Sequence, residues 1–137
     1  SGKEKDNLLN LIQKNNLSQK IQIFDEVQRE DLISYYEDAS VLIVSSRDEG
    51  GPRVALESLY LGVPVISTDV GHMPDILPNE LLAKKDNLTS LQNLLEAHVD
   101  KIDLIDQSAI FEFVQNEFSI DESIKDIEVA YDEVLNN

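Results

Sequence analysis

The chain has 137 residues, of which 42% are hydrophobic and 28% charged, a balance typical of a protein that folds into one domain. Its 27 acidic residues outnumber 11 basic ones, and the formal charge of -16 argues against a surface that binds nucleic acid or an anionic membrane. The absence of cysteine excludes disulfides, a cysteine nucleophile and a thiolate zinc site. No apolar run is long enough to span a bilayer or to form the core of a signal peptide. Together these observations lead us to expect a cytoplasmic location.

The first third of the chain alternates between helical and extended patterns. Leucine and isoleucine at helical spacing predict a helix over residues 4–15, which the turn-prone "KNNLSQK" ends. The next stretch, "KIQIF" at residues 20–24, alternates apolar and polar side chains and predicts a strand. A second helix is expected in "QREDLISYYEDAS", where apolar residues again recur at helical spacing.

Two continuous apolar runs, "VLIVSS" at residues 41–46 and "VPVIST" at residues 63–68, predict parallel strands that are covered on both faces. The segment between them predicts a helix, with Pro52 suited to its first turn and Gly62 suited to a left-handed C-terminal cap. The order of helices and strands predicts an α/β fold, a three-layer Rossmann-like parallel sheet flanked by helices.

The remainder of the chain continues the alternation. We expect a short helical turn in "GHMPDIL", a short strand in "ELLAKK", a helix over residues 88–99 and two closing helices within residues 102–137. No internal repeat or Gly/Ser linker divides the sequence, so residues 1–137 are expected to form a single domain.

The loop "EGGP" follows the strand expected at residues 41–46, and ligands of parallel sheets bind at the carboxyl ends of strands. Gly50 and Gly51 allow a ligand to approach the backbone closely, and the free N–H groups of the next helix suit a phosphate. The carboxylates of Glu49 and Glu57, eight positions apart, suit the paired hydroxyls of a sugar or a ribose. The pattern therefore fits a nucleotide sugar, and the alternative is an ordinary glycine turn with solvent-exposed glutamates.

The segment "SSRDEGGPRVALESLYLGVPVISTDVGHMPDIL" resembles the C-terminal donor-binding segment of GT-B glycosyltransferases of the retaining GT4 type, also called group 1. The E-x7-E motif of that family matches Glu49 and Glu57, and the likeness covers residues 8–95. The resemblance implies transfer of a glycosyl unit from a nucleoside-diphosphate sugar to an acceptor with retention of anomeric configuration. It implies a nucleotide sugar as the donor substrate, and it implies neither a cofactor nor a metal ion.

The resemblance also assigns roles to single residues. Glu49 would be the catalytic-site residue that faces the hydroxyls of the donor sugar, and Glu57 would bind the ribose diol. The backbone of Val27 would lie near the nucleobase. The other donor-binding residues would offer their backbone to the sugar and diphosphate, and they are Gly50, Gly51, Arg53 and Val54. The family often has an aromatic residue in place of Gly51 and a glycine in place of Pro52, which has no N–H to donate.

The remaining polar residues of this region have less specific expectations. Arg53 or Arg47 would supply positive charge beside the diphosphate, and His72 is expected to be a loop residue rather than a catalyst. The nearby aspartates are expected to be helix caps or surface charges, and these are Asp48, Asp69 and Asp75.

Segments typical of the family are not found in these residues, namely the strand, glycine turn and Arg/Lys pair that open its C-terminal half and its whole N-terminal acceptor domain. The chain is therefore expected to be a partial donor-binding domain that is inactive alone. Its expected partner is the N-terminal domain of the same protein. Any association with a membrane is expected to involve only the parts that these residues lack. The alternative is a non-catalytic α/β nucleotide-binding or receiver-like module. A receiver needs a phospho-accepting aspartate at a strand end, where "VLIVSSRDE" instead leads into "EGGP".

Overall fold

The computed structural model describes residues 4–104 and 106–118. The chain divides into two units, Ser1–Ser34 and Tyr35–Asn137, of which the structure describes these residues alone. The first unit contains helix α1 (Lys5–Lys14), which confirms the helix predicted over residues 4–15. Helix α2 (Arg29–Asp38) confirms the second predicted helix, and its last turns belong to the second unit. The second of the two predicted closing helices falls outside the described residues.

Within the first unit, a side-chain contact ties α1 to the stretch that follows it. Lys5 at the start of the helix donates from Nζ to Oδ1 of Asp25 at 2.6 Å. Ile12 is the buried residue of α1 in this unit, whereas Leu8, Leu9 and Leu11 are exposed.

The strand predicted for residues 20–24 is wrong, because this segment has no regular secondary structure. The amide of Ile21 donates to the carbonyl of Leu17 at 3.0 Å and so closes a turn instead of joining a ladder. An alternating pattern becomes a strand only beside a neighbour that takes up its backbone hydrogen bonds. Within the described residues, only the three strands of the second unit pair into a sheet.

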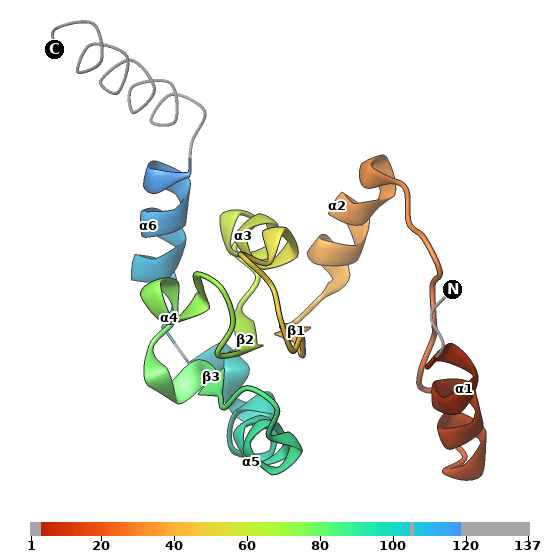
Figure 1. Ribbon diagram of the computed structural model, residues 1–137. Helices are drawn as coiled ribbons and strands as arrows, with labels where there is room; N and C mark the ends of the chain where they lie inside the picture. Colours follow the sequence, from red (N-terminus) through yellow and green to blue (C-terminus); the bar gives the residue numbers. More distant parts are fainter. Residues whose placement is uncertain (1–3, 105, 119–137) are drawn as a thin grey trace, which may run out of the picture. The chain divides into compact units, whose positions relative to one another are not determined.

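That sheet is parallel, with its strands in the order β1-β2-β3, and the register pairs Leu42 with Val65 and Thr68 with Ala83 (Figure 1). The strands predicted in "VLIVSS", "VPVIST" and "ELLAKK" are thereby confirmed, although each is shorter than its apolar run. The strands are β1 (Leu42–Val44), β2 (Val65–Thr68) and β3 (Leu82–Ala83). The helices are α3 (Arg53–Tyr60), α4 (Met73–Ile76), α5 (Leu88–His98) and α6 (Ser108–Glu117), with 3-10 turns η1 (Asn79–Leu81) and η2 (Val99–Leu104).

Helices cover both faces of the sheet, as the α/β pattern predicts. Helix α3 packs against β1, β2 and α6, whereas α5 packs against β3 and η2. In Figure 1, α3 and α5 lie on opposite sides of the strands. The core between these layers includes Leu59, Ile66 and Met73, none of which is exposed to solvent.

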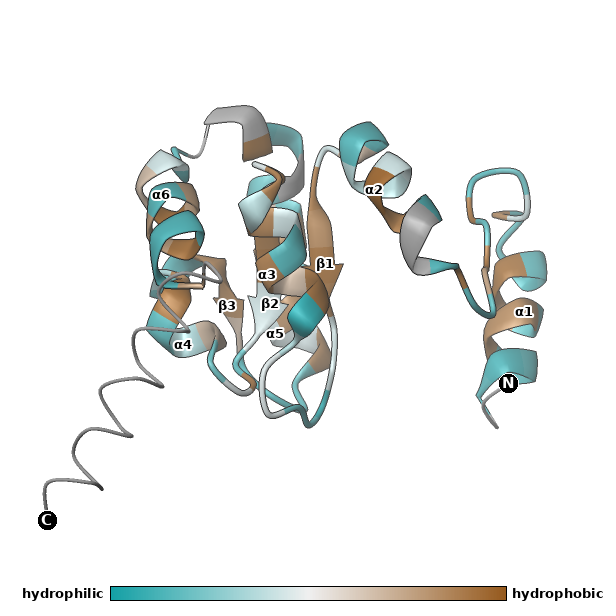
Figure 2. Cartoon of the chain, turned by 90° about the horizontal axis from the view of Figure 1, so that it is seen from above, coloured by the Kyte–Doolittle hydropathy of each residue, from teal (hydrophilic) through white to brown (hydrophobic). Residues whose placement is uncertain are grey.

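Strand β2 is buried along its whole length, but β1 is not. The side chain of Ile43 is 42% exposed, so the expectation that β1 is covered on both faces is wrong at this position. Successive side chains of a strand point to opposite faces, so Ile43 points away from the face to which Leu42 and Val44 point. Helix α5 packs against β3, at the edge of the sheet opposite to β1. In Figure 2, β1 and β3 are brown, whereas the loops at the carboxyl ends of the strands are largely teal or pale.

Helix α3 ends as its sequence predicts but begins one residue later than the expected position of Pro52. Pro52 immediately precedes the helix with φ near -70°, so it lies at the cap rather than inside the first turn. At the other end Gly62 adopts φ +77° and donates to Leu59 at 3.0 Å, and Val63 donates to Ser58 at 2.9 Å. These two bonds are a Schellman cap, and the left-handed residue that it requires is the predicted glycine.

Within the residues that the structure describes, no helix combines the length and apolar character that a membrane span needs.

Candidate functional site

The loops that follow the three strands meet at one edge of the sheet, because the strands are parallel. The hydroxyl of Thr68, at the end of β2, donates to the backbone carbonyl of Ser46 at 2.7 Å and so fixes the start of the loop after β1. On the other side of β2, the amide of Asp69 donates to the carbonyl of Ala83 at 2.8 Å. The candidate site is built on these tied strand ends.

The predicted glycine loop after β1 lies directly against the loop after β2. A Cβ atom on Gly71 would lie 2.4 Å from the carbonyl oxygen of Gly50, and Gly71 has φ +52°. A Cβ atom on Gly51 would lie 2.8 Å from Cδ2 of His72, whereas one on Gly50 would meet nothing within 4 Å. The two loops can therefore approach this closely only because Gly71 has no side chain.

The start of α3 presents free backbone N–H groups beside this loop. Ala55 donates to the carbonyl of Pro52 at 2.9 Å and is the first amide of the helix with an acceptor. The amides of Gly51, Arg53 and Val54 donate to no acceptor within the described part of the chain. Free N–H groups at a helix N-terminus carry partial positive charge and suit an anion.

The two glutamates of the motif lie in different surroundings. Glu49 is exposed in the loop and accepts a hydrogen bond from the hydroxyl of Ser46. Glu57, one turn inside α3, keeps 29% of its side chain exposed, and its Oε1 lies 3.8 Å from Nε of Arg53. Its other carboxylate oxygen, Oε2, accepts from the phenol hydroxyl of Tyr36 at 3.1 Å.

Tyr36 belongs to α2 and is only 7% exposed. Its hydroxyl oxygen also lies 3.4 Å from the carbonyl of Val54. Burial, together with the hydrogen bond to the Glu57 carboxylate, raises the pKa of Tyr36 to about 12, so the phenol keeps its proton at neutral pH. The helical spacing in the sequence indicates only that Tyr36 is one of the apolar positions of a helix. The signal for a further role is the phenol hydroxyl of Tyr36, which needs a hydrogen-bond partner when it is buried.

A cavity of about 320 Å³ opens between the loop after β1 and the start of α5. Asn87 caps that helix, since its side-chain oxygen accepts from the amide of Ser90 at 2.9 Å. Asp86, just before it, adopts a left-handed conformation with φ +54°. The lining combines hydroxyl, amide and charged groups with two leucines, and its residues are Ser45, Ser46, Arg47, Thr68, Asp86, Asn87, Leu88 and Leu91.

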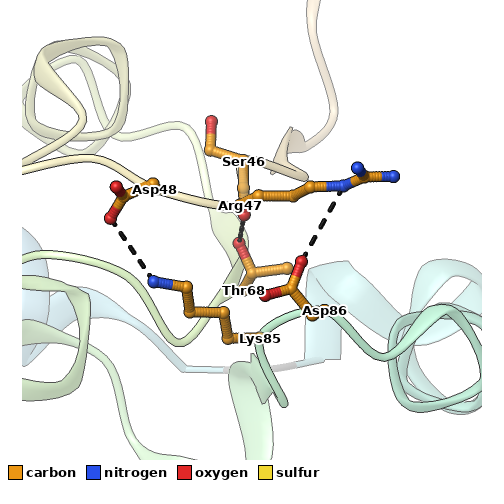
Figure 3. Close-up of polar contacts among 6 residues, drawn as sticks. All are labelled: Ser46, Arg47, Asp48, Thr68, Lys85 and Asp86. Carbon is orange, nitrogen blue, oxygen red and sulfur yellow. Dashed lines mark hydrogen bonds and ion pairs between the residues drawn. The ribbon is translucent and has the colours of Figure 1, made fainter.

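Two ion pairs connect the loop after β1 with the loop after β3 (Figure 3). Nε of Arg47 lies 3.9 Å from Oδ1 of Asp86, and Nζ of Lys85 lies 3.3 Å from Oδ1 of Asp48. All four side chains are well exposed, so each pair contributes at most about 1 kcal/mol. Sequence reasoning missed the residues 85–87, although an asparagine directly before a helical pattern is a strong N-cap signal.

The other predicted residues have simpler surroundings. Val27 is half-buried before α2 in the first unit, so its predicted place beside a nucleobase stays a prediction. Asp69 is exposed, and Asp75 in α4 lies 3.8 Å from the ring of His72, the residue that precedes this helix. No group of three His, Asp or Glu side chains that could hold a metal ion occurs within residues 4–104 and 106–118.

The parallel three-stranded sheet flanked by helices is similar to a domain of a GT-B glycosyltransferase. Residues 1–109 match the family described as glycosyl transferases group 1. Since this match covers most of the chain, the protein belongs to that family, as the resemblance of its motif implied.

Three similar proteins carry names that agree with this assignment. An uncharacterized glycosyltransferase of Methanocaldococcus jannaschii is 37% identical over 86 residues, which cover 61% of this chain and 24% of the relative. An uncharacterized glycosyltransferase of Haemophilus influenzae is 28% identical over 106 residues, 77% of this chain and 28% of the relative. The sucrose-phosphate synthase of Thermosynechococcus elongatus superposes with a TM-score of 0.81 at 25% identity, covering 98% of this chain and 35% of that one. The chain thus spans about a quarter of the two curated relatives and about a third of the synthase.

Proposed function

We propose that this chain is the donor-binding part of a retaining glycosyltransferase of the GT4 type, which transfers a glycosyl unit from a nucleoside-diphosphate sugar. Its family and its fold support glycosyl transfer. The observation that carries the more specific proposal is the placement of free amides at the start of α3 between Glu49 and Glu57. This order along the backbone matches the order of sugar, diphosphate and ribose in such a donor.

In this proposal the amides of Gly51, Arg53 and Val54 hold the diphosphate. Negative charge develops on the diphosphate as the glycosyl bond breaks, and fixed N–H dipoles at a helix N-terminus stabilise such charge. The guanidinium of Arg53 lies in the same first turn and adds positive charge, and Arg47 is exposed in the preceding loop. No step in this account requires a metal ion.

The two glutamates act at opposite ends of the donor. Glu49 accepts hydrogen bonds from the sugar hydroxyls, and the partly exposed Glu57 accepts them from the ribose diol. We propose that the backbone of Val27 lies near the base, as the family resemblance implies.

Calorimetric titration of the chain with UDP, ADP and GDP tests this proposal. At least one diphosphate is expected to bind, and Glu57→Ala is expected to weaken it roughly tenfold, because a hydrogen bond to a charged group is lost. Glu112→Ala, which removes an exposed glutamate from α6, is the matched control and is expected to bind as the unchanged chain does. Equal binding by Glu57→Ala would contradict the ribose contact.

We further propose that the acceptor is bound by parts of a longer protein, because the chain spans about a quarter of its curated relatives. The isolated chain is then expected to transfer no sugar, and measurable transfer by the purified polypeptide would contradict this. The alternative is a non-catalytic nucleotide-binding module. Assay of the longer protein against a panel of nucleotide sugars distinguishes the two.

A further inference from the structure

We propose that Tyr36 is a positioning residue for donor binding, whose hydroxyl holds the carboxylate of Glu57 in the orientation that accepts the ribose diol. This inference rests on the proposed function and adds a residue outside the E-x7-E motif. It is carried by the hydrogen bond from the Tyr36 hydroxyl to Oε2 of Glu57 at 3.1 Å.

The geometry distinguishes the two neighbours of the Tyr36 hydroxyl. A phenol has one hydrogen to donate, and the carbonyl of Val54 lies farther away, at 3.4 Å, than the carboxylate at 3.1 Å. A hydrogen bond to a charged acceptor is also the stronger of the two. The proton of Tyr36 therefore points to Glu57.

The other neighbour of Glu57 cannot hold the carboxylate equally well. Arg53 lies 3.8 Å from Oε1, beyond hydrogen-bond distance, and 77% of its side chain is exposed. Tyr36, in contrast, is 7% exposed, so packing fixes its ring. One side of the carboxylate is thus anchored by a buried group, while the part of Glu57 that remains exposed is free to accept the ribose hydroxyls.

Holding the Glu57 side chain in this way lowers the conformational-entropy cost of binding the ribose. A free glutamate side chain loses rotamer freedom when it binds a ligand, and a side chain that is already ordered loses less. A carboxylate has about four lone-pair sites, so a bond from Tyr36 leaves sites for both hydroxyls of the diol. Tyr36, whose pKa is raised to about 12, carries this hydrogen throughout the neutral pH range, as any phenol with its ordinary pKa also would.

The test compares Tyr36→Phe with the unchanged chain by calorimetry against UDP, ADP, GDP and inorganic pyrophosphate. Phenylalanine keeps the buried ring and removes only the hydroxyl. Nucleoside diphosphates are expected to bind roughly fivefold more weakly, whereas pyrophosphate, which has no ribose, is expected to bind equally well. In a Glu57→Ala background the same substitution is expected to cause no further loss, because the two residues act through one contact.

Tyr60→Phe, which removes an exposed hydroxyl from α3, is the matched control and is expected to change nothing. If the unchanged chain binds none of the diphosphates, the proposed function fails and the role of Tyr36 fails with it. If the chain binds them and Tyr36→Phe binds as tightly, only the role of Tyr36 is overturned. An equal loss for pyrophosphate, an additive loss with Glu57→Ala, or failure of Tyr36→Phe to fold would each show a structural role and overturn the proposal.

Discussion

Gly71 and Gly50 approach so closely that a Cβ atom on Gly71 would lie 2.4 Å from the carbonyl oxygen of Gly50. Gly71→Ala is therefore expected to lower the free energy of unfolding by about 2 kcal/mol, through the left-handed backbone and the backbone clash together. Urea unfolding followed by circular dichroism measures the loss. Gly50→Ala is the matched control, since its Cβ meets nothing within 4 Å. An unchanged unfolding midpoint for Gly71→Ala would refute the close contact.

Substitution of Gly62 isolates the cost of a left-handed backbone from any steric clash. Its φ is +77°, and a Cβ atom at this position would meet nothing within 4 Å. Gly62→Ala is expected to cost about 1 kcal/mol of stability, and Gly62→Asn less, since asparagine tolerates the left-handed region better. Chemical denaturation of both variants measures the difference. If alanine and asparagine were equally tolerated, the left-handed cap of α3 would be wrong.

The hydroxyl of Thr68 holds the backbone of Ser46, near the start of the loop that carries Glu49. Thr68→Val keeps the shape of this buried side chain but leaves the carbonyl of Ser46 without its donor at 2.7 Å. We expect a loss of about 2 kcal/mol in the free energy of unfolding. Thr89→Val, at an exposed position of α5, serves as the comparison and is expected to stay within about 0.5 kcal/mol.

In the first unit, the titration of the Asp25 carboxyl is sensitive to its contact with Lys5 of α1. The hydrogen bond from Lys5 and its positive charge lower the pKa of Asp25. A carboxyl whose pKa is lowered by folding adds stability above its unfolded pKa and loses that contribution as the pH falls through its folded pKa. Lys5→Met is expected to raise the pKa of Asp25 toward its ordinary value, as carboxyl NMR titration would detect. Lys14→Met, at the other end of α1, should leave the Asp25 titration unchanged.

Much of the fold was predictable because periodic patterns record which faces of a segment are buried. The helices and the three strands of the second unit follow from such patterns, and so does the glycine cap of α3. The segment at residues 20–24 could not be assigned in this way. Alternation describes one strand, whereas a strand also needs a neighbour, and the turn bonds of Ile21 occupy the backbone instead.

The candidate site was predictable only where it is local in sequence. Glu49, the glycines and Glu57 lie within one loop and one helix, so their spacing already places them together. The hydrogen bond between Tyr36 and Glu57, and the ion pair between Arg47 and Asp86, join residues that only the folded chain brings together. A spacing pattern in the sequence carries no information about such contacts.

The glycine loop lies inside the crossover that joins β1 to β2, and this position couples the site to the folding of the sheet. Parallel strands cannot pair through a hairpin, so the hydrogen bond from the amide of Leu42 to the carbonyl of Pro64 forms only when the whole crossover has closed. The loop therefore acquires its shape in the same event that assembles the sheet. By thermodynamic linkage, any ligand that binds only the ordered loop also holds β1 and β2 together.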